Sequence, residues 1–187
     1  MLNLCQIGES NAMNGREDKK SNDLFFTCGL IEYLARKTQN HPSFIVQALG
    51  EKRIAKIYEL ADVYHSDNID RVSNDLIEDC HIQNGTFDNI TSCEYSVPTH
   101  WDIGKVYKRL ILKVAETENI DMVHTLMEVY KSRITDLIEN YNSSFYYDSP
   151  SAIFETYRND CTPVADDWYC NQLRAVSGLQ HLTFPLK

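Results

Sequence analysis

The stretch that decides the fold is residues 21–76, SNDLFFTCGLIEYLARKTQNHPSFIVQALGEKRIAKIYELADVYHSDNIDRVSNDL. Its first part carries an apolar stripe in which Leu24, Cys28, Ile31 and Ala35 recur at steps of four, three and four. This spacing is typical of one face of an amphipathic α-helix, whereas a half-buried strand alternates every second residue. We therefore predict that the stretch opens with a helix.

The same pattern repeats along the rest of the stretch. Asn40-His41-Pro42 ends the first helix, because proline cannot continue the hydrogen-bond ladder. Further helices are predicted for residues 43–49, with Gly50 as their end, for residues 54–64 and for residues 69–76. Four amphipathic helices in succession imply a helical bundle.

Helical patterns also dominate the second half of the chain. A capping-box-like start at Thr99 opens one helix, residues 120–141 form the longest pattern, and Pro150 opens a short helix near the end. Only residues 94–97 alternate as a strand would, which is too little for a sheet. The predicted fold is an all-α bundle of six or seven amphipathic helices.

The predicted organisation follows from where the helical patterns begin and end. Polar residues with little to bury precede the bundle, and scattered hydrophobic residues without a sustained period follow it. We predict a mobile N-terminal tail (1–20), a helical domain (21–158) made of sub-bundles 21–82 and 99–158 joined by the loop 83–98, and an irregular C-terminal tail (159–187) with a short helix near 168–176.

Composition excludes several classes of function. The net charge of -9 and the isoelectric point near 5.1 argue against nucleic acid as a partner, because binding to phosphate backbones needs a basic face. No run approaches the length of a membrane span, so no membrane partner is predicted. The six cysteines lack the paired short spacings of a zinc site. We expect a cytoplasmic protein with reduced thiols and no bound metal or cofactor.

Three aromatic residues are candidates for a partner surface. Trp101 follows the capping threonine, and Tyr146 and Tyr147 are consecutive, so both tyrosines cannot face one core. Together with the acidic connection from Thr86 to Asp102 they predict a protein-binding surface. Alternatively, Trp101 staples its own helix to the bundle.

A second group of residues is polar and could form a junction between helices. An imidazole and two carboxylates within six positions would suit a divalent metal, but the same residues can cap helix ends. The candidates for this polar junction are His65, Asp67, Asp70 and Arg71 in the first half of the chain and His100 and Asp102 in the second half.

Two further pairs of residues have spacings that could suit a chemical site. Arg36 and His41 have a spacing found in some helical ribonucleases, although His41 precedes a proline and should lie in the break between helices. His124 and Glu128 are four apart on one helix and are expected to form an exposed pair. No complete catalytic set is predicted from these residues.

One predicted helix carries basic residues along one side, and core positions on the other. The basic stripe of Lys105, Lys108, Arg109 and Lys113 is interpreted as a solvated face. Leu110, like Ile57 in the first half of the chain, is expected to face the core.

Two sets of residues resemble an uncharacterised bacterial family of helical domains of unknown function, over residues 13–158. They are Phe25-Phe26-x-Cys28-x-x-Ile31-Glu32-Tyr33 with Ile57-Tyr58, His65, Val72 and Ile77, and then Pro98-Thr99-His100-Trp101-Asp102-Ile103-Gly104-Lys105-Val106-Tyr107 with Tyr141-Asn142-Ser143-Ser144. The family is of the kind encoded near predicted ADP-ribosyltransferase-like toxin genes. The resemblance implies a partner or regulatory role and carries over no catalytic residue.

Two hypotheses about function follow. The first is a protein-protein interaction or regulatory module without catalytic activity, whose partner is the product of a neighbouring gene. The alternative is a helical enzyme that is metal-dependent at His65, Asp67 and Asp70 or nuclease-like at Arg36 and His41.

Overall fold

The computed structural model describes residues 18–160, and within them the fold is all-α, as predicted. This part of the chain forms eight α-helices and one short 3-10 helix and contains no strand, not even at residues 94–97. The elements are α1 (Lys19–Thr38), α2 (Pro42–Glu59), α3 (Ala61–His65), α4 (Ile69–Asp79), α5 (His100–Glu118), α6 (Met122–Lys131), α7 (Ile134–Ile138), η1 (Phe145–Tyr147) and α8 (Pro150–Asp160).

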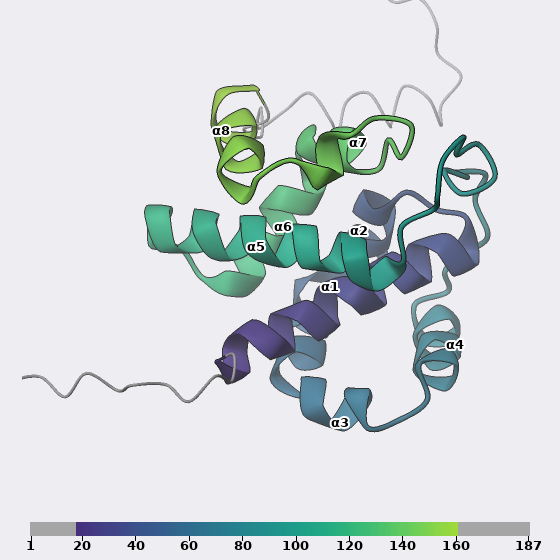
Figure 1. Cartoon of the computed structure of the whole chain (residues 1–187). Coiled ribbons are helices and arrows are strands. Elements are labelled where there is room, and N and C mark those ends of the chain that lie inside the picture. Colours follow the sequence, from purple (N-terminus) through teal and green to yellow (C-terminus); the bar gives the residue numbers. More distant parts are fainter. Residues whose placement is uncertain (1–17, 161–187) are drawn as a thin grey trace, which may run out of the picture.

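The arrangement is centred on α1 and α5. Figure 1 shows these two helices side by side, with α3 and α4 beyond α1 and with α7 and α8 beyond α5. One hydrophobic cluster runs through both halves of the bundle and includes Ile57 and Leu110, which are 1% and 2% exposed. Both residues therefore face the core, as predicted.

The first break between helices lies just before Pro42, as predicted. Gln39 adopts a left-handed conformation, with φ 52°, and its amide donates to the last carbonyls of α1. His41 then caps α2, with Pro42 in the first turn. The chain thus reverses without leaving the helix ends unsatisfied.

The helix that begins at Pro42 breaks at Gly50, as predicted. Gly50 is non-helical, with φ 69° and ψ 162°, so α2 (Pro42–Glu59) consists of two helical segments joined by a kink at the glycine. Glycine populates positive φ at little cost, so the chain can bend here and resume the helix. The next helix, α3, is correspondingly short.

The longest predicted helix, residues 120–141, is divided into α6 and α7. Ser132 between them is extended, with φ −82° and ψ 165°. The hydroxyls of Ser132 and Thr135 donate to the carbonyl of Val129, at 2.8 and 3.2 Å. Side-chain donors thus replace the amides that a continuous helix would supply.

The basic stripe is not solvated along its whole length. Lys108 is 5% exposed, and its ammonium lies 5.7 Å from the ring centroid of Phe25. Lys105, Arg109 and Lys113 are exposed. The prediction was wrong for Lys108, because a long aliphatic stem lets a lysine on the buried side pack against the core.

The connection between α4 and α5 is irregular but tied to the bundle. The amides of Gly85 and Phe87 donate to the carbonyls of Thr38 and Gln39, both at 2.8 Å. The Asn40 side chain donates to the Gln83 carbonyl at the same distance. These contacts hold the connection on the C-terminal end of α1.

Some sequence-based expectations fall at the ends of the chain. α1 begins at Lys19, inside the predicted N-terminal tail, and α8 extends to Asp160, inside the predicted C-terminal tail. The rest of both tails, residues 1–17 and 161–187, lies outside the described residues. In the described part, Cys28, Cys80 and Cys93 are free thiols, and no helix there has both the length and the apolar character needed to cross a membrane.

Candidate functional site

The predicted polar junction is only partly assembled, around Tyr33 of α1. The Tyr33 hydroxyl donates a hydrogen bond to Asp70, and the Tyr33 ring meets the His100 ring edge-on, with 5.2 Å between centroids. Lys37 Nζ lies 3.1 Å from Asp70 Oδ1. The Tyr33 hydroxyl and then Lys37 lower the pKa of Asp70, because both stabilise the carboxylate. α1 therefore links α4 to the start of α5.

His65 and Asp67 are directed to other partners. The His65 ring packs against Phe26, with 5.6 Å between centroids, and Asp67 pairs with Arg71 at 3.2 Å. Asn68 caps α4 with its side-chain oxygen. In the described part of the chain no three His, Cys, Asp or Glu side chains are grouped to hold a metal ion. The metal-dependent hypothesis thus has no ligand set there.

The Asp102 side chain helps to cap the N-terminus of α5. The Thr99 amide and hydroxyl donate to Asp102 Oδ2, at 2.8 and 2.6 Å, and the Asp102 amide donates to Thr99 Oγ1 at 3.1 Å. This is the capping box that the sequence predicts. The two donors from Thr99 lower the pKa of Asp102, so it carries its charge at the positive end of α5.

Arg36 and His41 are engaged by different partners. Arg36 donates to the carbonyl of Pro98 at 2.8 Å and to the hydroxyl of Tyr141 at 2.7 Å. His41 caps α2 and lies 3.4 Å from Asp136. The two side chains line different cavities. His41 lies in the break between helices, as its proline neighbour predicts.

Trp101 packs against the bundle. Its ring lies 5.4 Å from the Phe25 ring and 6.3 Å from the Phe26 ring, measured between centroids, and a Cβ atom on Gly29 would come within 2.3 Å of it. This placement favours the alternative in which Trp101 staples α5 to α1.

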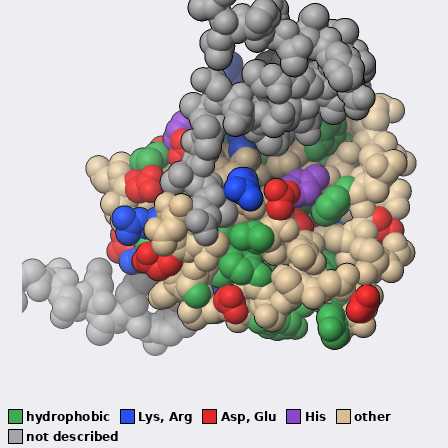
Figure 2. Space-filling model, turned by 90° about the horizontal axis from the view of Figure 1, so that it is seen from above, with side chains coloured by type: hydrophobic (Ala, Val, Ile, Leu, Met, Phe, Trp, Pro, Cys, Tyr) green, Lys and Arg blue, Asp and Glu red, His purple; other side chains and the backbone are tan. Residues whose placement is uncertain are grey.

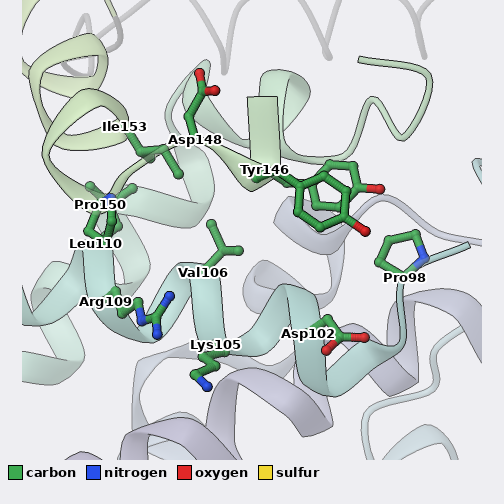
Figure 3. Close-up of a pocket in the computed structure, with 11 residues that line it drawn as sticks. Pro98, Asp102, Lys105, Val106, Arg109, Leu110, Tyr146, Asp148, Pro150 and Ile153 are labelled. Atoms are coloured by element: carbon green, nitrogen blue, oxygen red, sulfur yellow. The ribbon is translucent and has the colours of Figure 1, made fainter. Parts of the chain in front are cut away.

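The two tyrosines line a groove between α5 and the segment from η1 to α8. Tyr146 is buried and Tyr147 is 75% exposed, so they do not both face the core. Figure 3 shows the Tyr146 ring beside Pro98 at one end of the groove and Ile153 at the other end, with Val106 between them. This aromatic groove encloses about 280 Å³ and is lined by Pro98, Asp102, Lys105, Val106, Arg109, Leu110, Tyr146, Tyr147, Asp148, Pro150 and Ile153.

The charges along the aromatic groove are mixed. Lys105 and Arg109 are one turn apart on α5, both are exposed, and neither forms an ion pair with a described residue. Burial and the neighbouring Tyr147 hydroxyl raise the pKa of Tyr146 to about 12, so its hydroxyl stays neutral at physiological pH. In Figure 2, acidic, basic and hydrophobic side chains are interspersed on the visible face, and no continuous basic surface is seen there.

The end of the connection is fixed next to the aromatic groove. The Asn142 side chain donates to the Ser92 carbonyl at 2.8 Å and accepts from the Glu94 amide at 2.7 Å. Tyr95 and Val97, which follow, are 67% and 37% exposed. The two segments predicted to contact a partner are thus tied together.

Two buried glutamates form a cluster that the sequence analysis missed. Glu139 accepts hydrogen bonds from Tyr107 at 3.1 Å, from Tyr141 at 2.9 Å and from the side chain of Asn89 at 2.8 Å. Glu32 is 0% exposed and lies beside the Tyr130 hydroxyl and Glu139, whose side-chain hydrogen bonds act on its pKa in opposite directions. Three donors thus converge on Glu139, while Glu32 is less well supplied.

The surroundings of the two buried glutamates shift their pKa values. Burial raises the pKa of both carboxyl groups, and the charge of Glu139 raises the pKa of Glu32 further, against the opposing effect of Arg36. The pKa of Glu32 is therefore raised well above that of an ordinary glutamate. The sequence contained one signal, since Glu32 lies four residues after Cys28 on the apolar stripe of α1. Nothing in the sequence singled out Glu139.

Comparison of the chain with protein-family models, with curated proteins and with solved structures found no match.

Proposed function

We propose that this protein acts as a regulatory module that binds another protein through the aromatic groove and the exposed end of the connection. The observation that carries the proposal is the exposure of Tyr147, at 75%, directly beside a groove. Tyrosine supplies a large contact area with a polar end, which makes it a frequent anchor at interfaces.

The surface includes exposed apolar side chains from both segments. Tyr95, Val97 and Tyr147 are among the large exposed hydrophobic residues of the described chain, and Pro98, which follows Val97 in the connection, lines the groove. Hydrogen bonds from Asn142 hold the connection in place. A surface that is already ordered loses little conformational entropy on binding, which favours affinity.

The groove also indicates the chemistry of the partner. Lys105 and Arg109 offer two cations along one wall that form no ion pair within residues 18–160, while Asp102 is engaged by its capping box. The segment that fits is extended, with an aliphatic or proline side chain against Tyr147 and a carboxylate next to it for the two cations.

The resemblance stated above suggests where to find the partner. Because that family is of the kind encoded near ADP-ribosyltransferase-like toxin genes, we propose that this protein regulates such a toxin. We therefore propose the product of an adjacent gene as the partner.

The test is to place a photo-crosslinking amino acid at position 147 and, as a control, at exposed position 113 on α5, outside the aromatic groove. Each protein is co-expressed with the product of the adjacent gene and irradiated. We expect a crosslink from position 147 and none from position 113. Equal crosslinking from both positions, or from neither, would contradict the proposal.

Affinity measurements on matched variants extend the test. We expect Tyr147→Ala and the double change Lys105→Glu with Arg109→Glu each to raise the Kd at least about tenfold, the range for an interface anchor or a charge reversal, with an unchanged Tm. Lys113→Glu is the charge control and should leave the Kd unchanged. Unchanged affinity in the stably folded groove variants would rule this surface out.

A further inference from the structure

The aromatic groove lies close to the end of the described chain. Pro150 and Ile153, near the start of α8, line one wall of the groove, and α8 ends at Asp160. The helix rises about 1.5 Å per residue, so the chain continues from a point about 10 Å beyond Ile153. An extended chain covers about 3.3 Å per residue, so three or four further residues are enough to return to the groove.

The wall that α5 contributes has an excess of positive charge. Lys105 and Arg109 are exposed and form no ion pair within residues 18–160. Asp102, on the same helix, already accepts two hydrogen bonds from Thr99. Asp148 belongs to the opposite wall, and Figure 3 shows its carboxylate pointing away from the two cations. An occupant of the groove therefore gains most from carboxylates placed against α5.

The sequence that follows α8 has the matching chemistry. It reads Thr162-Pro163-Val164-Ala165-Asp166-Asp167-Trp168-Tyr169. Asp166 and Asp167 are the only acidic residues in the sequence from 161 to 187, which identifies the segment that can meet two cations. A proline and a valine precede them, and a tryptophan follows. These are the features proposed above for the partner segment, an aliphatic or proline side chain with a carboxylate next to it.

We propose that residues 162–169 occupy the aromatic groove of their own chain when no partner is bound. The proline end lies beside Ile153, the two aspartates face the two cations of α5, and the tryptophan packs against Tyr147. A short link to α8 gives the segment a local concentration of about 1 mM, which favours it over the same segment of a second copy. The inference rests on the proposed function in one respect, since it makes the segment a competitor of the partner.

The photo-crosslinking amino acid at position 147 tests the contact with no partner present. The purified full chain is irradiated at low micromolar concentration, and the crosslinked peptides are identified by mass spectrometry. We expect a peptide that contains Asp166 and Asp167, in a product of monomer size. Position 74 is the control, because it is exposed on α4, beyond α1 from the groove (Figure 1), and should give no such peptide. A missing crosslink, equal crosslinks from both positions, or a product of dimer size only would overturn the proposal.

Charge reversal tests the assigned pairing of aspartates with cations. Asp166→Lys with Asp167→Lys should lower the crosslink yield from position 147 at least about fivefold, and Lys105→Glu with Arg109→Glu should do the same. Combining all four changes restores opposite charges and should return the yield to within about twofold of the unchanged chain. Failure of the combined variant to recover, while its Tm stays unchanged, would overturn the pairing.

A matched variant controls for net charge. Asp75→Lys with Glu78→Lys, at exposed positions of α4, changes the net charge by the same amount as reversal of the two aspartates. It should leave the crosslink yield from position 147 unchanged. An equal fall in yield in this control would show that net charge, and not the local pairing, governs the contact, and would overturn the proposal.

The affinity for the product of the adjacent gene tests the competition. A segment that covers the groove reduces the fraction of protein ready to bind, so Asp166→Lys with Asp167→Lys should lower the Kd for the partner at least about threefold. An unchanged Kd would overturn the competition. Absence of partner binding by every variant would instead overturn the proposed function, because the crosslink within the chain involves no partner and succeeds or fails independently.

Discussion

The backbone of Gly29 lies directly against Gly104 where α1 packs on α5. A Cβ atom on Gly104 would come within 2.8 Å of the Gly29 nitrogen and 2.9 Å of its Cα. Both distances are shorter than van der Waals contact, and both involve backbone atoms that cannot rotate away. The separation of the two central helices is therefore set by this pair of glycines.

Gly104→Ala should destabilise the protein, although alanine is the better helix former. Alanine gains about 1 kcal/mol in helix propensity, but overpacking at this contact should cost about 1–3 kcal/mol beyond that gain. Urea unfolding measures the difference. The control is Asn74→Ala on the exposed side of α4, which should leave stability unchanged or slightly higher. A Gly104→Ala variant as stable as the unchanged protein would show that α1 and α5 can separate freely.

Replacing a large core residue with alanine should show which helix faces are buried. Ile57→Ala in α2 and Leu110→Ala in α5 should each lower the free energy of unfolding by about 2–5 kcal/mol, because each leaves a cavity in the same hydrophobic cluster. Lys113→Ala is the control, since this side chain is 54% exposed, and it should change little. Equal Tm values for the Ile57 and Lys113 variants would be incompatible with the packing described.

Glu32→Met should stabilise the protein at neutral pH. The substitution removes a fully buried carboxyl group whose charged form is disfavoured by burial and by the charge of Glu139, and it keeps an unbranched side chain of similar length. We expect the free energy of unfolding to rise by about 1–3 kcal/mol, the usual cost of a buried polar group whose hydrogen bonding is incomplete. Denaturant unfolding at constant pH is the measurement. A fall in stability instead would indicate that Glu32 contributes a favourable interaction within the folded chain.

The same variant should change how stability depends on pH. The pKa of Glu32 is near 4.5 in the unfolded chain and well above it in the folded protein, so the folded protein holds more protons between these two values. Its stability should therefore be greatest below pH 4.5, with respect to this group, and should fall as the pH rises through the folded pKa. Glu139 acts in the same direction. We expect the fall to be smaller in Glu32→Met, and parallel pH profiles would contradict this assignment.

The helices could be predicted from sequence because their signals are local. The stripe of α1, the proline after His41 and the capping box at Thr99 each depend on residues within a few positions of one another. The division at Ser132 could not be predicted, because hydrophobic spacing continues through it and hydroxyl groups replace the lost amides.

The candidate sites could be predicted only where exposure follows from the sequence itself. Consecutive tyrosines must point in different directions, which placed Tyr147 at the surface. The burial of Lys108 and the meeting of Glu32 with Glu139 depend on how distant helices pack. No local pattern contains that information, so neither feature could be predicted from the sequence.

The three donors to Glu139 have a consequence for how the protein opens. They come from Tyr107 in α5, from Tyr141 after α7 and from Asn89 in the connection, so one carboxylate joins three separate segments. The connection cannot detach without removing one hydrogen-bond donor from this buried carboxyl group, which is unfavourable. Although it contains no helix, it should unfold cooperatively with the bundle, and its Gly85 and Phe87 amides should exchange with solvent as slowly as those of α1.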